Sequence, residues 1–172
     1  GQRFGLRTVG VVRGEEPAIF NACLQDLQQM GMQLHFVSRS AYRHKEETAF
    51  HRELATLFGA FYCVPEGGAN LAGIRGCQEL GQHALFREYS HILLPCGTGT
   101  TLAGLVTATH GKVLGIQVLK GEGYLQQAVT GLLAQHGLTA AAQWQIMDNY
   151  HRGGYAKTDP ALLDFMSEFT AA

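Results

Sequence analysis

The stretch that decides the fold is His91–Gly104, which reads HILLPCGTGTTLAG. Its apolar start, His91–Leu94, predicts a buried strand, and the small residues after Thr101 predict a helix that lies close to the sheet. Cys96–Thr101 then forms the turn between strand and helix. Its glycines allow unusual dihedral angles and a close approach of the backbone to a ligand, and its threonine hydroxyls add hydrogen-bond donors.

Such a turn favours an anion, because the free N–H groups at a helix start carry the positive end of its dipole. The candidate phosphate-binding residues are Gly97, Thr98, Gly99, Thr100 and Thr101. No lysine follows them, so the turn differs from the GxxxxGK[ST] loop of nucleoside triphosphatases. The alternative interpretation is a purely structural turn with a threonine at the helix N-cap.

A dinucleotide is a poorer match to this loop. Its fingerprint needs a third glycine where the chain has Leu102, and an acidic residue where the next strand ends at Leu119-Lys120. NAD is therefore disfavoured. An NADP-dependent oxidoreductase stays open as an alternative, because Lys120 suits an extra phosphate.

Outward from this stretch, β-branched runs alternate with segments of helical spacing. The expected strands are Thr8–Val12, Gln33–Val37, Phe61–Val64, His91–Leu94, Val113–Leu119 and Trp144–Met147. Four apolar stripes predict helices: Ile19, Cys23, Leu27 and Met30; Phe50, Leu54, Leu57 and Phe58; Leu125, Val129, Leu132, Leu133 and His136; Leu162, Leu163, Met166 and Phe169. Asp159-Pro160 predicts a helix start, and Gly31, Gly59 and Gly137 predict helix ends.

This alternation predicts an α/β fold of three layers, with a mostly parallel sheet and helices on both of its faces. The 172 residues are 46% hydrophobic and 16% charged, which indicates a globular chain with a substantial core. A formal net charge of -1 gives no field that attracts nucleic acid or an anionic membrane. No apolar run approaches the roughly 20 residues that span a bilayer.

Cysteine and histidine usage argues against disulfides and metals. The cysteines at 23, 63, 77 and 96 form no CxxC pair, so we expect reduced thiols and, without a signal peptide, a cytoplasmic location. His44, Glu47 and His51 can share a helix face, but no histidine pair has zinc-site spacing. We therefore expect no metal site.

Two further stretches accompany the phosphate loop. Tyr62–Asn70 reads YCVPEGGAN, and Gly153–Ala156 reads GGYA. Together with the strand at the front, the order of these motifs resembles the 1-aminocyclopropane-1-carboxylate deaminase and D-cysteine desulfhydrase family over nearly the whole chain. The resemblance implies a pyridoxal 5'-phosphate enzyme with the Rossmann-like tryptophan-synthase-β fold, called fold type II, that is incomplete at both ends.

The resemblance also implies roles for individual residues. Gly97–Thr101 would hold the cofactor phosphate, Tyr155 would be a catalytic residue beside the cofactor and the substrate, and Glu66–Asn70 would line a cleft between lobes. Residues 1–65 would belong to the smaller lobe and residues 66–172 to the larger, cofactor-binding lobe. The implied reaction is a lyase-type elimination or a hydrolytic ring opening on a small amino acid, in a cytoplasmic homo-oligomer of amino-acid metabolism.

The chain also departs from the family pattern. The family's Schiff-base lysine lies in a G-N-K motif and its substrate carboxylate is bound by an S-N-H/Q motif, and neither motif occurs here. None of Lys45, Lys112, Lys120 and Lys157 matches that lysine. The chain also lacks an initiator methionine, so we expect a fragment with little or no turnover by itself. The alternative is a non-catalytic module that binds a phosphorylated ligand.

Overall fold

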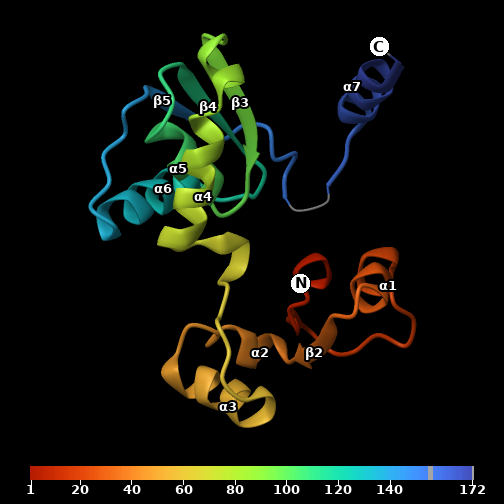
Figure 1. Ribbon diagram of the computed structural model, residues 1–172. Coiled ribbons are helices and arrows are strands. Elements are labelled where there is room, and N and C mark those ends of the chain that lie inside the picture. The colour runs from red at the N-terminus through yellow and green to blue at the C-terminus, as the bar shows by residue number, and fades with distance from the viewer. Residues whose placement is uncertain (155–156, 172) are drawn as a thin grey trace. The chain divides into compact units, whose positions relative to one another are not determined.

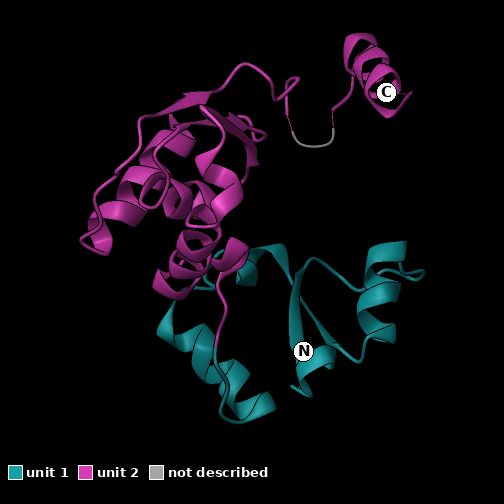
Figure 2. Ribbon diagram, turned by 45° about the horizontal axis from the view of Figure 1, so that its top comes forward, with its two compact units in different colours: residues 1–62 teal, residues 63–172 magenta. Residues whose placement is uncertain are grey.

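The structure is a computed structural model that describes residues 1–154 and 157–171. The chain divides into two compact units, unit 1 with Gly1–Tyr62 and unit 2 with Cys63–Ala172 (Figure 2). We expected the division after residue 65. Each unit combines parallel strands with helices, so the chain has the α/β architecture that the sequence predicted.

Unit 1 is built on a two-stranded parallel sheet. Its elements are a 3-10 helix at Gln2–Phe4, β1 (Val9–Arg13), α1 (Ala22–Gln29), β2 (Gln33–Val37), α2 (Arg39–Tyr42) and α3 (Thr48–Phe58). The strands pair from Val9 with Gln33 to Arg13 with Val37. The second predicted stripe is buried in part, because Phe50 and Leu54 of α3 have little exposure.

Unit 2 is built on a three-stranded parallel sheet in the order β3-β4-β5 (Figure 1). Its strands are β3 (His91–Cys96), β4 (Lys112–Gln117) and β5 (Trp144–Met147). Its helices are α4 (Leu71–Gly81), α5 (Thr100–Val106), α6 (Tyr124–Gln135) and α7 (Pro160–Ala171), with 3-10 turns at Glu66–Gly68 and Ala84–Arg87. None of the helices in the described part of the chain is long and apolar enough to cross a membrane.

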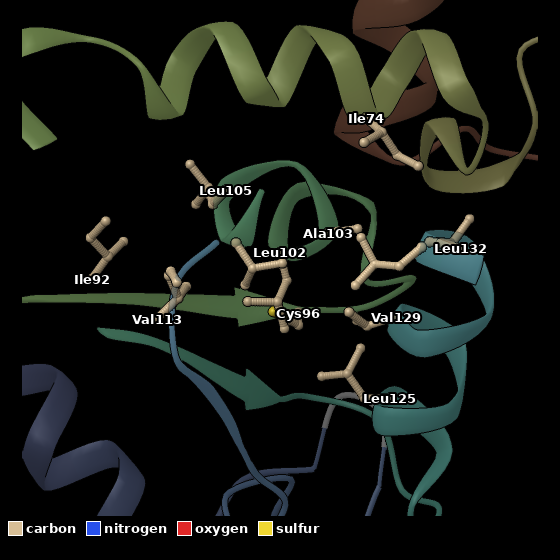
Figure 3. Close-up of a cluster of buried hydrophobic side chains, with 13 residues drawn as sticks. Ile74, Ile92, Cys96, Leu102, Ala103, Leu105, Val113, Leu125, Val129 and Leu132 are labelled. Atoms are coloured by element: carbon tan, nitrogen blue, oxygen red, sulfur yellow. The ribbon is translucent and has the colours of Figure 1, made fainter. Parts of the chain in front are cut away.

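The hydrophobic core of unit 2 lies between its sheet and helices α4, α5 and α6 (Figure 3). The alternate strand residues Ile92, Cys96 and Val113 face this core. The cluster also contains Ile74, Leu102, Ala103, Leu105, Val106, Leu125, Val129, Leu132, Leu133 and Ala142. Four residues of the third predicted stripe, Leu125, Val129, Leu132 and Leu133, are therefore confirmed as a buried helix face, whereas His136 is the half-buried C-cap of α6.

Within the described residues, these helices cover one face of the sheet, whereas we expected helices on both faces. The reason is the strand order. Right-handed crossovers between parallel strands that are added in one direction place every connecting helix on the same side. Leu93, on the opposite face of β3, is accordingly 62% exposed.

One predicted strand is absent, and one helix was not predicted. Phe61–Val64 forms no strand, because no described strand pairs with it, and Tyr62 and Val64 are exposed. Helix α4, which begins at Leu71 and contains three glycines, has no counterpart among the four predicted helices. The fourth stripe is helical as α7, but no residue in its described span is buried.

The predicted helix boundaries are confirmed. Asp159 Oδ1 accepts a hydrogen bond of 2.8 Å from Leu162 N at the start of α7. Gly31, Gly59 and Gly137 have positive φ angles just after α1, α3 and α6, where only glycine is unstrained.

The contact between α4 and α5 depends on Gly104. A Cβ at this position would overlap the Cβ of Cys77 and lie 2.7 Å from the carbonyl oxygen of Ile74. We predict that Gly104→Ala lowers the free energy of unfolding of unit 2 by about 1–3 kcal/mol through overpacking. Urea denaturation followed by the fluorescence of Trp144, the only tryptophan, measures this change.

Gly131→Ala is the matched control. Gly131 lies in α6 with open space around it, so alanine there should stabilise the helix by about 0.5–1 kcal/mol. Equal effects of the two substitutions would contradict the close packing of α4 on α5.

Candidate phosphate-binding site

The five predicted phosphate-binding residues lie in one turn, Gly97–Thr101, at the carboxyl edge of the unit 2 sheet. Strand β3 ends at Cys96 just before the turn, and the neighbouring β4 ends at Gln117. Ligands of parallel α/β sheets bind at this edge, because the loops that follow the strands converge there.

Gly99 fixes the course of this turn. Its φ of 86° lies in the left-handed region, which a side chain disfavours. A Cβ on Gly99 would lie 2.8 Å from Cγ2 of Val129 and 3.2 Å from Cδ1 of Leu125, so α6 fills the space beside it. Both the dihedral angle and the packing therefore require glycine.

The turn offers a series of unpaired backbone donors. In residues 1–154 and 157–171, the N–H groups of residues 97–101 donate to no acceptor. The first bond of α5 runs from Ala103 N to the Gly99 oxygen, at 2.9 Å, so helical hydrogen bonding begins beyond these donors. Successive N–H groups of this kind form a concavity that binds anions.

Two threonine side chains add hydroxyl groups. The Oγ1 atoms of Thr98 and Thr100 lie 3.2 Å apart, and Thr100 is only 4% exposed. One hydroxyl donates to the other, which leaves the second proton available to a bound oxygen. Thr101 is exposed on the first turn of α5.

The loop Glu66–Asn70 packs directly against this turn. A Cβ on Gly67 would overlap the side chain of Thr98, and a Cβ on Gly73 would lie 3.2 Å from Cγ2 of Thr100. Asn70 Oδ1 accepts a hydrogen bond of 2.8 Å from Gly73 N, which caps α4. The structure thus brings together two of the three motifs that the sequence analysis singled out.

Gln117 is a site residue that sequence reasoning missed. Its side chain is 1% exposed, and its Nε2 donates to the carbonyl oxygens of Leu119, at 2.9 Å, and Gly121, at 2.7 Å. Its Oε1 accepts a bond of 3.2 Å from Leu125 N at the start of α6. Gln117 therefore fixes the loop after β4 and the helix that contacts Gly99. A polar residue at a core-facing position of an apolar strand was the signal.

The other predicted residues lie in different places. Tyr155 falls outside the described residues. Lys112 starts β4 and thus lies at the opposite, amino edge of the sheet, whereas Lys120 follows β4 on the same edge as the turn. Lys45 belongs to unit 1, where its Nζ lies 5.2 Å from the centre of the Tyr42 ring.

Cys96, at the end of β3, is a neutral thiol. Burial raises its pKa to about 11, and its Sγ donates to the carbonyl oxygen of Leu94 at 3.6 Å. All four cysteines are free, and Cys23 and Cys63 are exposed.

In the described residues no three histidine, cysteine or acidic side chains group to hold a metal ion. His44 Nδ1 instead lies 2.6 Å from Glu47 Oε1.

The comparisons with known proteins leave the family of the chain open. No protein-family model matches it, and no curated protein is significantly similar to it.

We predict that Gln117→Leu lowers the free energy of unfolding of unit 2 by about 2–3 kcal/mol, because the buried N–H of Leu125 and the half-buried carbonyl of Leu119 lose their partner, and the Gly121 carbonyl loses one of its two donors. Denaturant unfolding measures the loss. Gln145→Leu is the control, since Gln145 is exposed on β5 and its replacement should change stability by less than about 0.5 kcal/mol. Equal effects would show that Gln117 does not organise the loop.

Cys96 should resist alkylation in the folded protein. At pH 8 a thiol with a pKa of about 11 is about one part in a thousand ionised, so iodoacetamide should modify Cys23 and Cys63 first. Mass spectrometry of timed samples measures the order. Early modification of Cys96 would contradict its burial.

Because burial raises the pKa of the folded Cys96 thiol above its ordinary 9.0, this thiol ionises at a lower pH in the unfolded state than in the folded state. The free energy of unfolding should therefore fall as the pH rises from about 9 to about 11.

Proposed function

We propose that Gly97–Thr101 binds the phosphate group of pyridoxal 5'-phosphate, and that the chain is part of a fold type II deaminase or desulfhydrase. The observation that carries the proposal is the series of unpaired N–H groups at residues 97–101, beside the hydroxyl of the buried Thr100. A phosphate ester has enough acceptor oxygens to use all of these donors. The order of the three motifs supports the choice of cofactor.

The donor set fits a phosphate group. Gly97 has open space beside its Cα, so oxygen atoms can approach the backbone there. Gly67 and Gly73 have no side chain, which lets their segment pack closely against Thr98 and Thr100. Lys120, on the loop after β4, supplies a positive charge on the same edge of the sheet.

When bound, pyridoxal 5'-phosphate supplies an electron sink for reactions at the α-carbon of an amino acid. The chain's own residues then bind and orient. Gly97–Thr101 would hold the phosphate, and Gln117 would keep α6 against Gly99. The resemblance implies Tyr155 as the catalytic residue beside the substrate, a small amino acid that undergoes elimination or ring opening. The family's cofactor-linked lysine has no counterpart in residues 1–172, so this chain alone should bind without a covalent link and turn over little.

A non-catalytic module for a phosphorylated ligand is the second candidate, and the absent lysine motif favours it. An NADP-dependent oxidoreductase is the third, favoured by the position of Lys120. In the first proposal, the deaminase or desulfhydrase is a cytoplasmic homo-oligomer.

Calorimetric titration of the 172-residue chain tests the proposal. Pyridoxine 5'-phosphate is the best ligand, because it carries the phosphate but lacks the aldehyde that reacts with surface lysines. We predict that Thr98→Val and Thr100→Val each weaken its binding about 10- to 100-fold, since a hydrogen bond to a charged group contributes roughly 1.5–3 kcal/mol. Thr130→Val, on the exposed surface of α6, should leave binding unchanged.

Three comparisons separate the candidates. Pyridoxine without phosphate should bind at least about a hundredfold more weakly. Equal binding of pyridoxine and its phosphate would overturn the phosphate site. Phosphate binding without preference for the pyridine ring would favour the non-catalytic module, and tighter binding of NADPH would favour the oxidoreductase.

A further inference from the structure

Unit 1 contains a hollow that the proposed function does not use. It has a volume of about 740 Å³ and lies where β1 and β2 end. Its lining residues all belong to unit 1, and they are Arg13, Gly14, Glu15, Ser38, Arg39, Ser40 and Arg43. Small-molecule sites fall in the same range of volume and form at this edge of parallel sheets.

The charge of the hollow is predominantly positive. Its lining includes three arginines, Arg13, Arg39 and Arg43, and one acidic residue, Glu15. Among the described residues, Glu15 makes no ion pair with these arginines, and the side chains of Arg39 and Arg43 make no ion pair or hydrogen bond. The hollow therefore presents donors that have no internal partner.

Hydrogen bonds of Ser38 fix the turn of the backbone that carries Arg39 and Arg43. Ser38 Oγ accepts a hydrogen bond of 3.1 Å from Ala41 N and lies 2.9 Å from Ser40 Oγ, which fixes the turn that begins α2. Arg39 and Arg43 are four residues apart on this turn and thus share a face. On β1, the Arg13 guanidinium lies 6.0 Å from the centre of the Tyr42 ring. Three arginines from two segments of the chain thus line one hollow.

We propose that this hollow binds a small anionic metabolite through its phosphate or carboxylate groups. The planar guanidinium fork pairs with either group through two parallel hydrogen bonds. The hydroxyls of Ser38 and Ser40 supply further hydrogen-bonding groups at the rim. Because every lining residue lies in unit 1, the proposal is independent of the phosphate turn in unit 2.

Calorimetric titration of the full 172-residue chain with inorganic phosphate and with citrate, at constant ionic strength, tests the proposal. We expect saturable binding of at least one of these anions, and the tighter one identifies phosphate or carboxylate as the recognised group. Arg39→Gln and Arg43→Gln should each weaken it about tenfold. Arg52→Gln removes an exposed charge on α3 of the same unit and should leave the affinity unchanged.

Amide chemical shifts of the unaltered protein provide a test that does not depend on the variants. Saturable shifts at residues 13–15 and 38–43 support the hollow as the site, whereas shifts at residues 97–101 report the phosphate turn, so each site succeeds or fails by itself. Absence of saturable shifts at residues 13–15 and 38–43, or an equal loss of affinity in Arg52→Gln, would overturn the proposal.

Discussion

The contact between Gly99 and helix α6 is the constraint on which the candidate site depends. Gly99 has a left-handed dihedral angle, and Leu125 and Val129 of α6 leave no room for a side chain at its position. Leu125 is held in turn by the hydrogen bond that its N–H donates to Gln117 at the start of α6. The backbone donors of the turn are consequently preorganised, which reduces the entropy lost when an anion binds.

The direction of the sheet gives the site its position. Since β3, β4 and β5 are parallel and follow one another in space, their carboxyl ends form one edge, and α5 and α6 return on one face. The turn after β3 and the loop after β4 therefore lie on the same edge. On the face of the sheet that these helices do not cover, Leu93 is exposed.

Much of this arrangement was predictable from local pattern. The strand β2 matches its prediction residue for residue, and β1 and β5 follow from β-branched and apolar runs. Asp159 as a cap and the glycines at the helix ends follow from backbone chemistry that any chain shares. The turn at Gly97–Thr101 was predictable because glycine and hydroxyl residues between a strand and a helix have few other roles.

The errors came from features that depend on distant residues. Phe61–Val64 has strand composition, but a strand exists only with a pairing partner. Helix α4 was hidden by glycines that its packing against α5 requires, as the overlap at Gly104 with Cys77 shows. Gln117 was detectable as a polar residue at a core-facing position of an apolar strand, but its partners, the carbonyl groups of Leu119 and Gly121, could not be predicted from the sequence.

The most direct measurement of the central claim is the amide chemical shift of residues 97–101 during titration with pyridoxine 5'-phosphate. The account predicts saturable downfield shifts of these amides as their N–H groups donate to the phosphate oxygens. Saturable shifts elsewhere in the chain, with the amides of residues 97–101 unchanged, would contradict it.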